Sequence, residues 1–414
     1  MLSAISRIES GAARSVLNRD GGFPSSQLYL ANKKFEKPPP QELGRVASAA
    51  DVEDDEQREI GVREKESKVL ILYTGGTIGM KATESGAYAP EAGYLPGAVR
   101  ATPQLSEAEY VRRWYAACSP YPHALPPVKN CDRRIVYWIL EYEPLLDSSD
   151  MTFDDWLRIA TDIYDAYDDY DGFVILHGTD TLSYTASALS FMLENLGKPV
   201  VLTGSQIPVC EVRSDGRENL ISAIIIAGNY DIPEVTVMFN AKLFRGNRTM
   251  KMDNSALDAF CSPNMRPLAS FEINIKVDSD AIYRSSEAKK LSLLRKFNRN
   301  VSIIRVFPSM SINAVRGALQ EPVEGVVLQT FGSGNMPSRR TDILEELRAA
   351  VARGVLILNC SQCHRGRVDK HYHTGKILFD MGVISGSDMT PEAALTKLAF
   401  VLGRDDWSME KKKK

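Results

Sequence analysis

Four nearly continuous apolar runs, separated by helical patterns, constrain the fold of this chain most strongly. The runs are VLILYT (69–74), GFVILH (172–177), PVVLTGS (199–205) and EVTVMFN (234–240). Strands that are buried on both faces of a parallel sheet have this composition, whereas strands with one solvated face alternate apolar and polar residues. The alternation of such strands with helices predicts an α/β domain with a mostly parallel sheet.

Helix ends and a second set of strand patterns extend this prediction along the chain. Thr152 and Asp155 form a capping-box pattern at FDDWLRIATDIYDAY, and Thr390 followed by Pro391 begins a helix at TPEAALTKLAFVLG. Three more strand patterns, VSIIRVF (301–307), GVVLQTFG (325–332) and GVLILNC (354–360), follow a polar stretch. They predict a second, smaller α/β domain.

The composition divides the 414 residues into five predicted segments. These are a disordered tail at 1–66, a larger domain at 67–276, a linker at 277–299, a smaller domain at 300–404 and a tail at 405–414. The first segment is charged and contains KPPPQ, a composition that cannot form a core. Its first 20 residues also allow a mitochondrial transit peptide, although Glu9 and Asp20 oppose that interpretation.

Charge and hydropathy exclude several classes of partner. A net charge of −3 favours neither nucleic acid nor an anionic membrane. The densest apolar stretch, at 221–227, is much shorter than the ~18 residues of a membrane span. Six cysteines in a chain of this length indicate a reducing compartment rather than a disulfide framework, so we predict a cytoplasmic protein.

Polar loops follow three of the strand patterns, at the ends where ligands bind in parallel sheets. VLILYT leads into GGTIG, GFVIL into HGTDT, and PVVLT into GSQIP. The glycines do not have the G-x-G-x-x-G spacing of a dinucleotide site, and the chain contains no G-K-[ST] of a P-loop. On these residues alone, Thr77 is either a helix cap or a nucleophile in a glycine turn. Thr179 and Asp180 are either a hydroxyl–carboxylate pair that binds an amine or orients a base, or part of a helix start in which Thr181 or Asp180 is the cap.

A cysteine and histidine cluster near the C-terminus has a less specific pattern. CSQCH (360–364) matches the spacing of c-type haem attachment, and Cys360, Cys363, His364 and His371 could ligate zinc. Because Cys360 ends an apolar strand pattern, we interpret it as a small packing residue and predict neither metal nor cofactor. His177 also ends a strand pattern and is interpreted as a hydrogen-bonded core histidine.

TGGTIG (74–79) and DGFVILHGTDT (171–181) resemble the two signature motifs of the L-asparaginases of bacterial type, the asparaginase/glutaminase family. The similarity continues through EPLLDSSDMT (143–152), RSDGRENL (213–220), FRGNRTMK (244–251) and GVISGSDMT (382–390), and covers about residues 68–404. LENLGKPV and FRGNR look like the cytoplasmic type I branch, and ALPPVKN looks like its animal version. The resemblance implies two α/β domains, the larger with a flavodoxin-like sheet, no cofactor, and a homodimer or homotetramer.

The resemblance also implies hydrolysis of L-asparagine to L-aspartate and ammonia through a threonine ester. Thr77 matches the nucleophile of the family. Thr179, Asp180 and Lys251 match a second set, in which hydroxyl and lysine activate the attacking group or water. Because a carboxylate beside a lysine favours the charged ammonium, we interpret Lys251 as a group that polarises Thr179. Tyr88 matches the tyrosine of a mobile loop that closes over the substrate.

Binding of the substrate's amino-acid head is implied for a third loop. Asp147, Ser148 and Ser149 match the family's loop for this head, and Asp180 also meets the α-ammonium. Two alternatives remain open at this stage. One is a glutaminase or mixed amidase, because one methylene contributes only about 1–3 kcal/mol of discrimination. The other is a non-catalytic amino-acid sensor that uses the same pocket.

Overall fold

The computed structural model describes residues 63–285, 289–369 and 373–414. The predictions for residues 1–62, including the transit peptide, lie outside the described residues. The strands are β1 (Glu66–Gly75), β2 (Met80–Ala82), β3 (Tyr88–Pro90), β4 (His123–Ala124), β5 (Arg134–Leu146), β6 (Gly172–Leu176), β7 (Leu193–Glu194), β8 (Val200–Thr203), β9 (Val235–Phe239), β10 (Lys242–Arg245), β11 (Met250–Lys251), β12 (Phe260–Cys261), β13 (Ala269–Phe271), β14 (Ile275–Val277), β15 (Ser292–Leu293), β16 (Val301–Arg305), β17 (Gly325–Thr330), β18 (Leu356–Ser361) and β19 (Ile384–Ser385). The helices are α1 (Tyr94–Ala101), α2 (Ala108–Tyr115), α3 (Phe153–Asp165), α4 (Leu182–Met192), α5 (Gly216–Asn229), α6 (Ile312–Leu319), α7 (Thr341–Ala352), α8 (His373–Asp380), α9 (Pro391–Leu402) and α10 (Met409–Lys413).

The larger domain is built on a nine-stranded sheet with the order β14-β13-β10-β9-β8-β6-β1-β5-β4. Its five central strands, β9, β8, β6, β1 and β5, are parallel. Numbered along the chain, these five have the order 2-1-3-4-5 of a flavodoxin-like sheet. The predicted α/β class and the parallel sheet are therefore confirmed, with antiparallel strands added at both edges.

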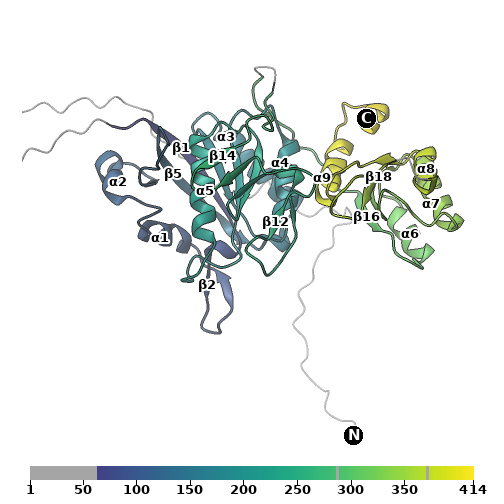
Figure 1. Ribbon diagram of the computed structural model, residues 1–414, viewed down its shortest axis with the longest axis horizontal. Helices are drawn as coiled ribbons and strands as arrows, with labels where there is room; N and C mark the ends of the chain where they lie inside the picture. Colours follow the sequence, from purple (N-terminus) through teal and green to yellow (C-terminus); the bar gives the residue numbers. More distant parts are fainter. Residues whose placement is uncertain (1–62, 286–288, 370–372) are drawn as a thin grey trace, which may run out of the picture. The chain divides into compact units, whose positions relative to one another are not determined.

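Helices cover both faces of this sheet, which explains why its central strands carry apolar side chains on both faces (Figure 1). Leu70 and Leu72 of β1 belong to the core that contains residues of α3 and α4. Val69, Ile71 and Tyr73 point to the other face, where residues of α1 and α5 form a second core. Alternate side chains of one strand are thus buried in two different cores.

Two segments differ from the sequence interpretation. β5 is a 13-residue strand next to β1, and no strand was predicted there. The apolar run IVYWIL at 135–140 was the signal that could have revealed it. Within the predicted linker, β15 pairs antiparallel with β7, so part of that segment continues the structure of the larger domain. No helix in the described part of the chain is long and apolar enough to cross a membrane.

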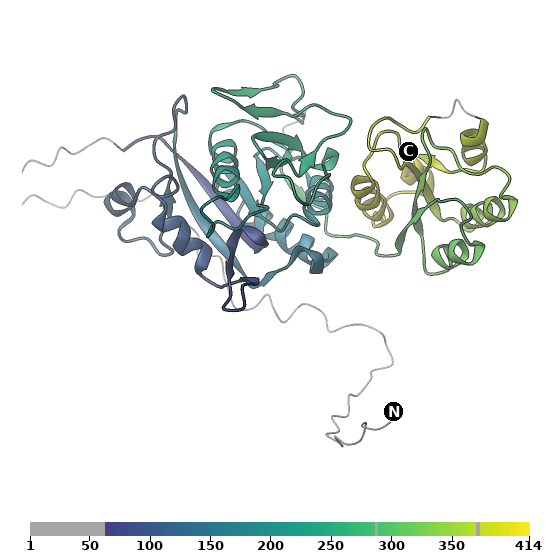
Figure 2. The same ribbon diagram turned by 60° about the horizontal axis from the view of Figure 1, so that its bottom comes forward.

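The smaller domain has a parallel four-stranded sheet in the order β16-β17-β18-β19, with helices beside it (Figure 2). Its helix α9 begins as predicted, because the Thr390 side chain accepts the amide of Ala393 and Pro391 occupies the first turn. The capping box of Thr152 and Asp155 at α3 is also confirmed. The α9 ring of Phe400 stacks on Phe191, with 5.8 Å between centroids.

Candidate active site

The turn after β1 places Thr77 at a point where three chain segments meet. Thr77 begins a short 3-10 turn whose cap residue is Gly76, so the interpretation of Thr77 as a helix cap was wrong. Gly75 and Gly76 have φ of 133° and 89°, a region that side chains disfavour. A Cβ at these positions would lie 2.1 Å from the Leu146 carbonyl oxygen and 2.4 Å from Gly178, respectively. The two glycines therefore allow the ends of β1, β5 and β6 to touch.

The loop after β6 carries a connected set of polar side chains. Lys251 Nζ donates to Thr179 Oγ1 at 2.9 Å and to Asp180 Oδ1 at 2.7 Å. Thr179 is 8% exposed, whereas the Asp180 side chain is 65% exposed and that of Lys251 20%. Lys251 therefore contacts a buried hydroxyl, that of Thr179, and an accessible carboxylate, that of Asp180. Lys251 reaches them from β11, 72 residues along the chain from Thr179.

The order of the strands explains why these loops are neighbours. In a 2-1-3-4-5 sheet the connections diverge between the first and third strands, which leaves a crevice at their carboxyl ends. Here those strands are β1 and β6, which pair in register from Val69 with Gly172 to Tyr73 with Leu176. Thr77 follows one strand and Thr179 the other. The Thr74 hydroxyl ties the two ends together by donating to the Leu176 carbonyl at 2.9 Å.

The DSSD loop after β5 lies against the HGTDT loop at the same edge of the sheet. Asp147 Oδ1 accepts the amide of Ser149 at 2.8 Å, which fixes the start of the turn. Ser148 is buried and packs against Gly178, while Asp147 and Ser149 are exposed. Thr181, the cap residue of α4, donates its hydroxyl to the Ser148 carbonyl at 2.6 Å. That bond fixes the DSSD loop to the HGTDT loop.

A fourth loop contributes residues that sequence reasoning did not single out. Thr179 Oγ1 donates to Gln206 Oε1 at 3.4 Å. The Asp215 carboxylate accepts the backbone amides of Gln206 and Ile207 at 3.0 to 3.1 Å, which holds this loop in place. The GSQIP motif indicated a polar loop here, but only the tertiary contact identifies Gln206 as a neighbour of Thr179.

Tyr88 occupies a different position from the other predicted residues. It is 46% exposed on β3, and its hydroxyl donates to Glu211 Oε1 at 2.8 Å. The described contacts thus bring together Thr179, Asp180 and Lys251, place the Thr77 turn and the DSSD loop against them, and hold Tyr88 at Glu211.

His177 is a buried structural histidine, as predicted. Its Nδ1 donates to the Gly178 carbonyl at 2.7 Å, and its Nε2 accepts the Thr185 hydroxyl at 2.9 Å. Thr185 Oγ1 in turn accepts from Trp156 Nε1 at 2.9 Å. Both ring nitrogens are therefore used by a neutral imidazole directly before Gly178 and Thr179. Burial lowers the pKa of His177 to about 4.

This lowered pKa predicts a loss of stability in mild acid. The unfolded chain binds a proton at His177 near pH 6.5, whereas the folded protein does so only near pH 4. Stability from this group is therefore complete above pH 6.5 and decreases as the pH falls toward 4, by on the order of 3 kcal/mol. In thermal melts at pH 7.5 and 5, we expect His177→Gln to lose less stability than the wild type. Replacing the exposed His364 should change nothing, and an equal loss in His177→Gln and wild type would contradict the prediction.

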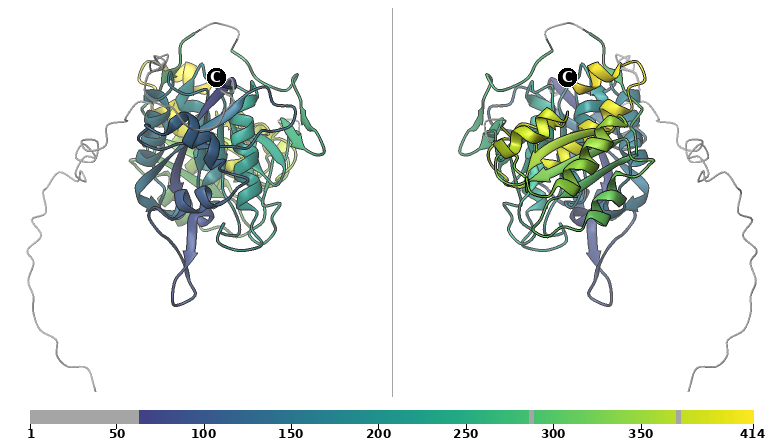
Figure 3. Two further views of the ribbon diagram at one scale, coloured as in Figure 1. Left: turned by 90° about the vertical axis from the view of Figure 1, so that its left-hand side faces the viewer. Right: turned by 90° about the vertical axis from the view of Figure 1, so that its right-hand side faces the viewer.

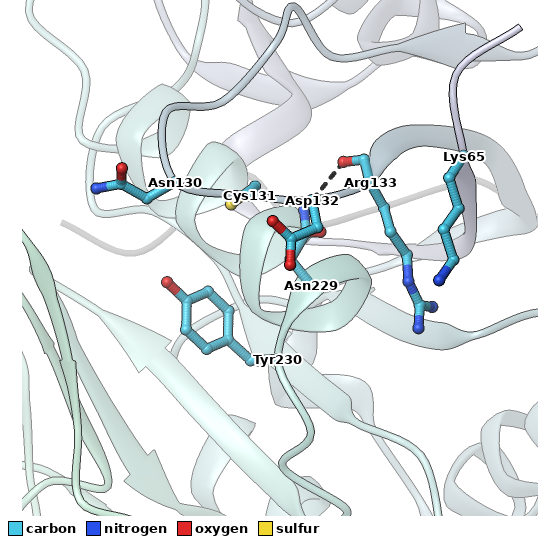
Figure 4. A pocket seen from close by; sticks show the side chains of 7 residues that line it. All are labelled: Lys65, Asn130, Cys131, Asp132, Arg133, Asn229 and Tyr230. Carbon is cyan, nitrogen blue, oxygen red and sulfur yellow. Dashed lines mark hydrogen bonds between the residues drawn. The ribbon is translucent and has the colours of Figure 1, made fainter.

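Two other features lie apart from these loops. A pocket of about 240 Å³ opens at the amino ends of β1 and β5, opposite to the strand ends that carry Thr77 and Thr179 (Figure 4). Its lining includes Lys65 and Asn229, and Asn229 donates to the Arg133 carbonyl at 3.5 Å. In the CSQCH motif, Cys360 is buried in the core of the smaller domain, and burial raises its thiol pKa to about 12. His371 lies outside the described residues, and those that are described contain no group of three side chains that could hold a metal ion.

Comparison with known proteins identifies the family. Residues 68–283 match the asparaginase N-terminal domain, and residues 300–414 match the glutaminase/asparaginase C-terminal domain. An L-asparaginase of Dirofilaria immitis is 62% identical over 84% of this chain and 59% of its own length. A 60 kDa lysophospholipase of Mus musculus is 44% identical over 84% of this chain and 61% of its own. This chain thus spans about six tenths of the length of these two relatives.

A solved structure supports the same assignment. The crystal structure of L-asparaginase I from Vibrio cholerae matches with a TM-score of 0.71 and 42% identity, over 84% of this chain and 96% of that one. The fold of this chain therefore agrees with that of a solved L-asparaginase. The chain belongs to the asparaginase/glutaminase family.

Proposed function

We propose that this protein hydrolyses L-asparagine to L-aspartate and ammonia. The observation that carries the proposal is the contact of Lys251 Nζ with both Thr179 Oγ1 and Asp180 Oδ1. Thr179 and Asp180 follow β6, and Thr77 follows β1, the strand that pairs with β6. A hydroxyl, an ammonium and an accessible carboxylate at one strand end suit an amide of a zwitterionic amino acid. The names and identities of the relatives agree with this assignment.

In the proposed mechanism, Thr77 Oγ attacks the side-chain carbonyl carbon of asparagine and loses its proton to a basic group of the site. Collapse of the tetrahedral intermediate breaks the C–N bond, and the nitrogen leaves as ammonia with the transferred proton. Water then hydrolyses the aspartyl ester and releases aspartate. Thr179, polarised by Lys251, is positioned to relay a proton in one of these steps. Backbone amides near Gly76 and Gly178 are the proposed donors to the developing oxyanion.

The amino-acid head of the substrate is assigned to the opposite side of the crevice. The exposed carboxylate of Asp180 is suited to pair with the α-ammonium, and the exposed Asp147 and Ser149 flank it. Ser148 is buried against Gly178, so its proposed contribution is mainly to shape this loop. Tyr88 is assigned a role when the hairpin of β2 and β3 closes over the substrate. In this closed state the hairpin covers the ester and excludes water.

Initial rates of ammonia release from asparagine and glutamine test the proposed function directly. We expect a higher kcat/KM for asparagine. Equal values would instead indicate a mixed amidase, and thermal stabilisation by aspartate without turnover would indicate an amino-acid sensor. Because one relative is named a lysophospholipase, a lysophospholipid is included as a third substrate. Fatty-acid release without ammonia release would overturn the proposal.

Two further properties remain predictions. A homodimer or homotetramer is expected, and light scattering on the purified protein measures it. A cytoplasmic location is supported by the six cysteines, all of which are free thiols in the structure. Fractionation of cells that express the full chain distinguishes this location from a mitochondrial one.

A further inference from the structure

The hairpin that carries Tyr88 is largely exposed to solvent. This lid hairpin, residues 80–90, consists of β2 and β3, each of three residues, and projects from the larger domain (Figure 3). Most of its residues are exposed. A two-stranded hairpin is marginally stable by itself, so bonds between its side chains and the domain decide where it lies.

Tyr88, the proposed catalytic tyrosine, is bonded to Glu211, which lies outside the hairpin. The two residues are 123 positions apart, and the phenol donates to the carboxylate at 2.8 Å. This hydrogen bond, in which the phenol is the donor, raises the pKa of Tyr88. Lys81 instead contacts Glu91 at 3.4 Å and the ring of Tyr94, residues that directly follow the hairpin.

The loop that contains Glu211 also contacts Thr179 and the residue that follows Thr77. Gln206 accepts from the Thr179 hydroxyl at 3.4 Å. The Val209 amide donates to the carbonyl of Ile78, the residue after Thr77, at 3.1 Å. Since Asp215 clamps the base of the loop, residues 206–211 form one fixed element that contacts three parts of the proposed site. Glu211 is therefore held at a defined position relative to the Thr77 turn.

We propose that Glu211 is a positioning residue that holds the lid hairpin open. In this state the Tyr88 hydroxyl is bonded to Glu211, and on closure Tyr88 exchanges Glu211 for a partner in the site. The proposal rests on the proposed function, which assigns Tyr88 to the closed state. A bond that exists only in the open state opposes closure, so its removal shifts the population toward the closed lid.

Steady-state kinetics of Glu211→Ala test this shift. We expect the KM for asparagine to fall by about three- to tenfold, the range of the ordinary net contribution of one hydrogen bond, because both side chains of this bond are accessible to water. Glu211→Gln, which can still accept from the phenol, should lie between Glu211→Ala and wild type. The matched control is Glu84→Ala, which removes an equal charge from the turn of the same hairpin and should leave KM unchanged. In a Tyr88→Phe background, removal of Glu211 should have no further effect on KM.

Hydrogen exchange provides a readout that does not depend on turnover. Without substrate, the exchange rate of the amides of residues 80–90 should differ in Glu211→Ala from that in wild type and Glu84→Ala, because the equilibrium between the open and the closed hairpin shifts. An unchanged exchange rate in Glu211→Ala would overturn the inference, as would a KM that is unchanged or higher. If the wild type released no ammonia from asparagine, the proposed function would fail, and exchange alone would then decide whether Glu211 holds the hairpin.

Discussion

Thr77→Ala is expected to lower kcat for asparagine by at least about 1,000-fold, because it removes the hydroxyl that forms the ester. The fold should be retained, since Thr77 is only half-buried and Gly76, not Thr77, caps its turn. Ammonia release in a coupled assay measures the loss. In acid-quenched wild-type enzyme, mass spectrometry should find an aspartyl adduct on the peptide that contains Thr77, and none in the variant.

Thr77→Ser is the matched control for this experiment. It keeps a hydroxyl at the same position and should retain partial activity, whereas Thr77→Val keeps the shape and should be as inactive as alanine. Thermal melts of all three variants should agree with the wild type. Full activity in Thr77→Ala would remove Thr77 as the nucleophile and would direct attention to Thr179, the other threonine of the site.

The second large effect is expected for Thr179 and Lys251, which are joined by a hydrogen bond of 2.9 Å. Thr179→Val and Lys251→Met should each lower kcat by about 100- to 10,000-fold, the range for loss of a proton-transfer group. Because the hydroxyl depends on the ammonium for its activation, the two residues act as a unit. The double variant should therefore be no slower than the slower single variant.

Additive losses in the double variant would contradict this coupling and would assign the two residues to separate steps. Lys242→Met is a suitable control, because Lys242 is a partly exposed lysine that pairs with Asp258 at 3.2 Å and has no assigned role. It should leave kcat unchanged. Asp180 loses its partner in Lys251→Met, so a change of KM is also expected in that variant.

Features that depend on neighbours within a few residues were predictable from the sequence. The parallel core strands follow from apolar runs, and the starts of α3 and α9 follow from Thr152 with Asp155 and Thr390 with Pro391. Each of these signals acts over one helical turn or one strand. β5 shows the limit of this reasoning. Its apolar residues are interrupted by Glu141, and the strand runs directly into the DSSD loop without a turn signal that marks its end. The assignment of roles to Thr77 and Lys251 came from resemblance to a family.

The sequence by itself determined which residues end the strands: a glycine turn with Thr77 after β1, and Thr179 with Asp180 after β6. The tertiary structure decided which of these ends are neighbours, because only the strand order 2-1-3-4-5 places β1 beside β6 at the point where the connections diverge. It also decided that Lys251 reaches Thr179 across 72 residues and that Tyr88 is held by Glu211. The physical reason is the distance along the chain between the interacting residues. Helix caps and strand patterns involve residues close in sequence, whereas these contacts depend on the order of the strands and on the close packing of the glycine loops.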